Sequence, residues 1–156
     1  HGREHSFPTR RSSDLALGYV DAAEEERLLD YSAAHHPLDQ LVPCATVAGL
    51  LAARDAAAAI PVALVLRRYI VSLVQATRTH PAVQMGASPR ASMAIFQLAR
   101  ALALFDGAAF VTPDSIQDIA PDVLAHRLAL DSQARYSGTT AAEVVREILA
   151  RIPVPL

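Results

Sequence analysis

Helix-start signals recur along this chain of 156 residues and restrict it to a largely helical fold. In Ser88-Pro89 and Thr112-Pro113 a hydroxyl residue precedes proline, which is favourable because the hydroxyl suits the N-cap and the fixed φ of proline suits the first helical position. Residues 21–24 and 140–143 have the pattern of capping boxes, since each begins with Asp or Thr and ends with Glu. Each of these segments therefore predicts the beginning of a helix.

Apolar periodicity completes the helices between these starts. We expect helices at 21–34, 46–59, 61–79, 88–106, 121–128 and 140–151, and a short one from 113. The expected core positions on the two longest helices are Val62, Val65, Leu66, Tyr69, Ile70, Leu73, Val74, Ile95, Leu98, Ala99, Leu102 and Phe105. Gly107 suits the C′ position of the helix over 88–106, residues 80–87 are expected to form a loop, and at most one short strand is expected, near 109–111 or 129–130. The predicted fold is an all-α helical bundle.

The composition describes a single globular domain and excludes several classes of function. Hydrophobic residues make up 52% of the chain and the formal net charge is −2, so a chain of this length can bury a core. An acidic chain without lysine is a poor ligand for nucleic acid, because that affinity comes mainly from neutralised phosphates. The apolar run 56–66 is interrupted by Pro61 and is shorter than the roughly 20 residues of a membrane span. A single cysteine, Cys44, fits a reducing compartment, so we expect a cytoplasmic protein with no membrane span and no nucleic-acid partner.

The most informative candidate site is Gly86-Ala87-Ser88-Pro89-Arg90. Ser88 and Pro89 begin a helix, and Arg90 then lies in its first turn, at the positive end of the helix dipole. A cation there is disfavoured by about 0.3–1 kcal/mol. An anion would remove the conflict, since helix N-termini bind phosphate and a guanidinium adds a bidentate charged partner. The pattern alone is equally compatible with a surface arginine that pairs with a nearby carboxylate.

Other candidate sites are weaker. Four histidines lie outside the first residues of the chain, namely His35, His36, His80 and His126. They form no i,i+4 pair and have no cysteine partners, so no metal site is predicted, and His80 is expected to anchor a loop by hydrogen bonding. Arg67, Arg68 and Arg78 are candidates for an intersubunit face, although solvated helix charges are the simpler interpretation.

Five segments occur in a characteristic order and spacing. They are Arg78-Thr79-His80-Pro81, Gly86-Ala87-Ser88-Pro89-Arg90-Ala91, Ala99-Arg100-Ala101-Leu102-Ala103-Leu104, Val111-Thr112-Pro113-Asp114 and Val123-Leu124-Ala125-His126-Arg127-Leu128. Together they resemble the C-terminal lid of the MoxR family of AAA+ ATPases. The resemblance runs from about Leu17 to the proline-rich tail and is densest between Tyr69 and Leu128. It implies that residues 86–90 are the sensor 2 motif, and that Arg90 reaches the nucleotide phosphates between the lid and a P-loop core.

The resemblance also implies a cofactor and partners. ATP would be the ligand of residues 86–90, with Mg²⁺ held by the lid's own AAA+ core domain. The lid would act in a homo-oligomeric ring, a hexamer, that remodels protein substrates in a bacterial cytoplasm. This chain offers neither a lysine for a P-loop nor a hydrophobic strand that ends in Asp-Glu for Mg²⁺, so it is expected not to hydrolyse ATP alone. The alternative function is a nucleotide-independent helical protein-interaction module.

The N-terminal residues are interpreted apart from the fold. Residues 5–15 resemble the translation of a sequencing adapter, and residues 1–4 its index sequence. We therefore expect 1–15 to be a non-native scar, with a basic N-terminal arm as the alternative. Residues 16–21 are expected to be a remnant of the AAA+ core, including a strand over 15–20, and residues 22–156 to be the lid.

Overall fold

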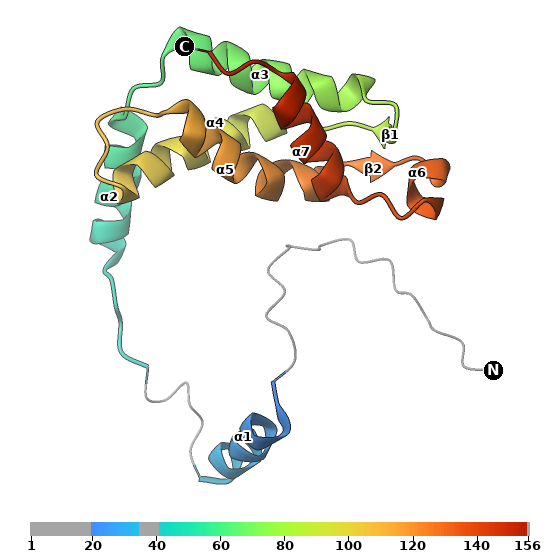
Figure 1. Cartoon of the computed structure of the whole chain (residues 1–156). Helices are drawn as coiled ribbons and strands as arrows, with labels where there is room; N and C mark the ends of the chain where they lie inside the picture. Colours follow the sequence, from blue (N-terminus) through green and yellow to red (C-terminus); the bar gives the residue numbers. More distant parts are fainter. Residues whose placement is uncertain (1–19, 35–40, 156) are drawn as a thin grey trace, which may run out of the picture. The chain divides into compact units, whose positions relative to one another are not determined.

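The computed structural model describes residues 20–34 and 41–155, which belong to two compact units that divide between Leu51 and Ala52. The first unit contains α1 (Ala22–Ala34) and the beginning of α2 (Val47–Ala59). The second, which we call the helical domain, contains the end of α2 and then α3 (Leu64–Thr79), β1 (Val83–Met85), α4 (Pro89–Phe105), α5 (Pro113–Leu124), the 3₁₀ turn η2 (Ala125–Arg127), β2 (Ala129–Leu130), α6 (Ser132–Tyr136) and α7 (Ala141–Arg151). The predicted all-α class is confirmed (Figure 1). The scar expected at 1–15 and most of the strand expected at 15–20 lie outside the described residues, and so do His35 and His36.

The helix ends follow the local sequence signals. Thr112 Oγ1 accepts a hydrogen bond from the backbone N–H of the third residue of α5 at 3.3 Å. At the start of α7, Glu143 N–H donates to Thr140 Oγ1 at 3.2 Å and Thr140 N–H donates to Glu143 Oε2 at 2.7 Å, which completes a capping box. Gly107, with φ +66°, follows α4 in the left-handed conformation expected of a C′ residue.

The core of the helical domain lies between α3, α4, α5 and α7, which lie close together in Figure 1 with α7 running across the direction of α3. The largest fully buried side chains come from all four helices: Leu73, Ile95, Ile116, Leu124 and Ile148. Tyr69 packs into the same core and its hydroxyl accepts a hydrogen bond from Gln117 Nε2 at 3.2 Å. Burial of this apolar surface is the main force that holds the helices together.

A two-stranded antiparallel ribbon lies at one end of the bundle (Figure 1). Val83 pairs with Leu130 and Met85 with Ala129, with an irregular register between them. The strand expected at 129–130 is confirmed, whereas β1 falls in the segment expected to be a loop, and the described residues 109–111 form no strand. A strand of three residues is too short to show an alternating pattern in the sequence. It is a strand because it forms backbone hydrogen bonds with β2.

The buried face of α4 is narrower than predicted. Leu98 and Phe105 are 48% and 86% exposed, and Leu102 is only partly buried, although all three were expected in the core. The buried row is instead Ala91, Ile95, Ala99 and Ala103. These positions recur at i, i+4, so α4 packs along a single line of mostly small side chains, and small side chains allow neighbouring helices to approach closely.

Two proline positions also differ from the prediction. Pro121 lies inside α5 rather than at the start of a separate helix. An interior proline costs about 3 kcal/mol, and the burial of Ala120 and Val123 on either side of it offsets that cost. Helix α3 begins at Leu64, three residues after Pro61, and Val65 in its first turn is 48% exposed instead of buried.

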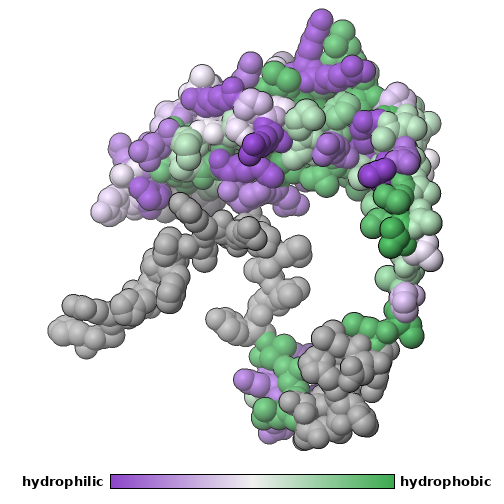
Figure 2. Space-filling model, turned by 180° about the vertical axis from the view of Figure 1, so that it is seen from behind, coloured by the Kyte–Doolittle hydropathy of each residue, from purple (hydrophilic) through white to green (hydrophobic). Residues whose placement is uncertain are grey.

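No residue of helix α2 is buried, in contrast to α3, α4, α5 and α7. Val47 and Leu50 are exposed, and the surface of α2 in Figure 2 is largely coloured as hydrophobic. Its C-terminal end is held to the helical domain, where Arg100 Nε donates to Ile60 O at 3.0 Å. Within the described ranges no single helix is long and apolar enough to cross a membrane, and α2 with α3 meets that test only as a pair bent by 99°.

Candidate functional site

The loop that precedes α4 is fixed by the last turn of α3. The buried Thr77 Oγ1 accepts a hydrogen bond from Ala87 N–H at 2.9 Å and donates one to Val74 O at 2.7 Å. Arg78 Nε donates to Ala87 O at 2.9 Å. Both backbone polar groups of Ala87 are therefore satisfied by α3 side chains. We call Thr77, Arg78 and Ala87 the Ala87 clamp.

Gly86 is a second fixed point in the same loop. A Cβ placed on this residue would lie 2.7 Å from Arg78 Cα and 2.8 Å from Arg78 N. Its φ is not in the left-handed region, where only Gly107 and Gly138 are found among the described residues. Glycine is required at position 86 because two backbone segments approach closely there.

Arg90 lies in the first turn of α4, directly after the clamped loop. Ser88 is the N-cap, with φ −78° and ψ 167°, and Pro89 occupies the first helical position as predicted. The Ser88 hydroxyl makes no capping hydrogen bond. Arg90 is exposed, and within residues 20–34 and 41–155 its guanidinium has no ion-pair or hydrogen-bond partner. The carboxylate partner that would have made Arg90 a structural residue is not found in that part of the chain.

His80 anchors the beginning of the loop, as expected from the sequence. It is 8% exposed, and its Nδ1 accepts a hydrogen bond from Ala82 N–H at 3.3 Å. The proton of a neutral ring then lies on Nε2, 3.2 Å from Glu147 Oε2 on α7. The loop is thus tied to α7 at one end and to α3 at the other.

The site contains donors for an anion and no set of metal ligands. A guanidinium, a free hydroxyl and the N-terminus of a long helix come together at Ser88–Arg90, and all three favour phosphate or carboxylate oxygens. Over the described ranges, no group of three or more His, Cys, Asp and Glu side chains is arranged to hold a metal ion.

Similarity to known proteins covers this site. The AAA lid domain family matches residues 75–148, a range that includes the Ala87 clamp and all of α4 and α5. The chain is 34% identical to the chaperone MoxR1 of Mycobacterium tuberculosis over 150 residues, or 90% of this chain. This chain carries a MoxR-type AAA+ lid.

Two further proteins are similar to most of this chain. The uncharacterized protein YeaC of Bacillus subtilis is 36% identical over 142 residues, or 91% of this chain. A solved structure from Cytophaga hutchinsonii, described as that of a candidate ATPase, superposes with a TM-score of 0.76 and 25% identity over 90% of this chain. The chain spans 44% of YeaC, 39% of MoxR1 and 45% of the C. hutchinsonii protein.

Sequence reasoning identified the segment 86–90 but missed the residues that fix it. Thr77 and Arg78 are ten and nine residues from Ala87, and no motif predicts that they contact it. One signal was available for Thr77, since it continues the apolar stripe of α3 three residues after Val74. A hydroxyl in a buried stripe needs a hydrogen-bond partner, and the following loop is the nearest source of one.

Proposed function

We propose that this chain is the nucleotide-responsive lid of a MoxR-type ATPase, with Arg90 as its sensor 2 arginine. The guanidinium would bind phosphate oxygens of ATP in the cleft between the lid and the nucleotide-binding core. The observation that supports this best is an exposed arginine in the first turn of α4 that has no partner among the described residues and follows a loop whose backbone is clamped to α3. An ordinary surface arginine has no need of such a support.

The residues at the tip fit this ligand. Arg90 offers a planar fork for two oxygens, and the Ser88 hydroxyl, which caps nothing, is available to donate to another. Gly86, Ala87 and Pro89 contribute the backbone that presents them. The lid's own core domain would supply the P-loop lysine and the acids that hold Mg²⁺. Bound Mg-ATP supplies the phosphoryl group, and the part of this chain is to bind and orient it.

The wider proposal concerns the whole enzyme. The lid would act with its core in a homo-oligomeric ring, a hexamer, in a bacterial cytoplasm. The ring would use ATP hydrolysis to remodel a protein substrate. The similarity to MoxR1, which is named a chaperone, supports this class of activity.

The test is substitution of Arg90 in an intact enzyme that contains this lid. A charge-assisted hydrogen bond is worth about 1.5–3 kcal/mol, so Arg90→Ala should weaken nucleotide binding or turnover by roughly 10- to 150-fold. Arg90→Lys should recover only part of the loss, because a point charge lacks the planar fork. The matched control is Arg68→Ala, which removes the same charge from an exposed position of α3.

Stability separates this role from a structural one. Removal of a cation from the positive end of a helix should leave the unfolding temperature unchanged or slightly raised. An Arg90→Ala variant that unfolds more easily while it keeps full nucleotide affinity would contradict the proposal. Unchanged turnover in both variants would favour the alternative, a nucleotide-independent interaction module.

A further inference from the structure

Positive charge is concentrated on α3 and α4. No Asp or Glu occurs between Asp55 and Asp106, whereas five arginines do: Arg67, Arg68, Arg78, Arg90 and Arg100. This segment therefore carries a formal charge of +5 in a chain of net charge −2. Cations that have no carboxylates nearby in sequence are suited to a partner that brings its own.

A groove of about 480 Å³ runs between these two helices, and its lining residues all belong to them. The buried Ile70 and Val74 form its floor, and Val71 and Met93 are apolar yet 44% and 59% exposed at its sides. Phe96 also lines it. The α3 residues in the groove follow one face of that helix, and apolar side chains form most of the lining of this depression, which we also call the channel.

Two arginines mark the ends of this channel. Arg67 and Arg78 both line it, and their separation of eleven residues along α3 corresponds to about 16 Å, or three helical turns. Each is held by its Nε, which donates to Val62 O and Ala87 O respectively, both at 2.9 Å. Neither guanidinium forms an ion pair with a carboxylate of the described residues. Their positions are therefore fixed while their charges are left for a partner.

We propose that this groove binds an acidic amphipathic helix of a partner protein. Apolar side chains at three- and four-residue spacing would enter the channel. Carboxylates about three turns apart would pair with Arg67 and Arg78. The complementary charge favours this occupant over an uncharged one. The proposal does not depend on nucleotide binding by Arg90, although the groove also includes Pro89, the neighbour of Arg90.

Other anionic partners fit this shape less well. A flat lipid surface cannot enter a concave channel. Single-stranded nucleic acid binds through stacking on aromatic side chains. In this groove the one aromatic side chain is Phe96, whose ring is already covered by the Arg100 guanidinium, 5.1 Å from its centroid.

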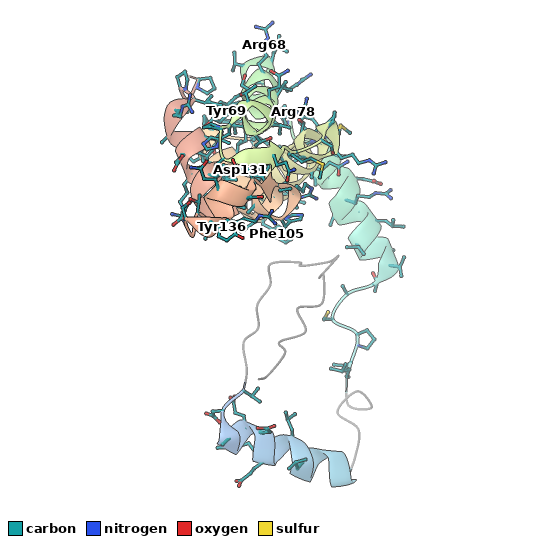
Figure 3. The ribbon with its side chains drawn as sticks, turned by 90° about the vertical axis from the view of Figure 1, so that its right-hand side faces the viewer. Arg68, Tyr69, Arg78, Phe105, Asp131 and Tyr136 are labelled. Carbon is teal, nitrogen blue, oxygen red and sulfur yellow. The ribbon has the colours of Figure 1, made fainter. Side chains whose placement is uncertain are left out.

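The experiment is a fluorescence anisotropy titration of the full chain against a labelled helical peptide at low salt. The peptide carries leucines at three- and four-residue spacing and glutamates at both ends of the leucine stripe. Arg67→Glu should weaken binding by about tenfold or more, whereas Arg68→Glu should change it by less than about twofold. Arg68 is a close control because it lies next in sequence on the same helix yet projects away from the rest of the domain (Figure 3). Met93→Glu, at an exposed position of the groove, should likewise weaken binding by about tenfold or more, because it places a carboxylate where an apolar side chain of the peptide would pack.

Several results would overturn the proposal. A glutamine version of the peptide that binds equally well would remove the role of charge. If Arg68→Glu lost as much peptide affinity as Arg67→Glu, the net charge of the chain alone would explain the binding. Binding of a thymidine oligonucleotide or of phosphatidylserine vesicles with the same dependence on Arg67 would assign the groove to another class of partner. If the folded wild-type chain does not bind the acidic peptide at all, the proposal is refuted. If Arg67→Glu fails to fold, as judged by its circular dichroism spectrum, the result for Met93→Glu is used instead.

Discussion

Replacement of Thr77 by valine should destabilise the helical domain by removing one hydrogen-bond acceptor without changing the size of the side chain. Thr77 is fully buried, and its hydroxyl accepts from Ala87 N–H at 2.9 Å. Ala87 is 1% exposed, so water cannot take the place of the lost oxygen. The hydroxyl also donates to Val74 O, but an α-helical carbonyl keeps its i+4 partner when that donor is removed.

The size of the destabilisation follows from the one group that loses its partner, the backbone N–H of Ala87. A buried donor left without an acceptor costs about 1–3 kcal/mol. Threonine and valine have similar helix propensities and similar volumes, so neither term offsets the loss. For a domain of about 100 residues, 1 kcal/mol corresponds to roughly 4 °C. Thr77→Val should therefore lower the unfolding temperature by about 4–12 °C.

Urea unfolding followed by far-UV circular dichroism measures this effect. The midpoint should fall while the slope of free energy against urea stays unchanged, because the two variants bury similar surface. Thr79→Val is the matched control, since Thr79 is exposed in the same turn and its hydroxyl reaches Ala76 O only at 3.4 Å. The control should stay within about 0.5 kcal/mol of the wild type. If Thr77→Val were equally neutral, or the control equally damaging, the clamp would not contribute as we describe.

Three further predictions concern stability. Gly86→Ala should cost about 1–3 kcal/mol, because its new methyl group meets the α3 backbone; an unchanged unfolding midpoint would contradict the close approach. Ile95→Ala, at a fully buried position, should cost about 2–5 kcal/mol, whereas Phe105→Ala, at an exposed one, should cost less than about 0.5 kcal/mol. Hydrogen bonds from the Thr140 backbone and hydroxyl hold the pKa of Glu143 below its ordinary value of 4.5. Its carboxylate therefore stabilises the fold above that pH and loses the effect as the pH falls through the lowered pKa, so the wild type should lose stability more steeply in acid than Glu143→Gln, and parallel pH profiles would contradict this.

Helix ends were predictable because their determinants are local. The capping box at 140–143 and the left-handed Gly107 depend only on residues within one turn, and so does the N-cap at Thr112. Pro121 was misjudged because its local preference for a helix start competes with burial of its neighbours. That burial is set by α7 and α4 and is not visible in a local pattern.

The position of the candidate site could be predicted from the sequence, but the contacts that hold its loop in place could not. Arg90 was located from its motif, and its exposure agrees with an open helix tip. The Ala87 clamp and the close approach at Gly86 exist because the loop after α3 folds back against the last turn of that helix. No residue pattern specifies this path of the chain. Phe105 and Leu98 show the same limit in the core, since periodicity predicts that a helix has a buried face and leaves the width of that face to its neighbours.

The attachment of Ala87 to α3 has a kinematic consequence. Because the loop is bonded to the last turn of α3 rather than only to its own neighbours, the first turn of α4 has no independent freedom to swing. The backbone of Arg90 therefore moves together with α3, and its exposed side chain adds only the reach of its own rotamers. A displacement that shifts the end of α3 would be transmitted directly to the first turn of α4.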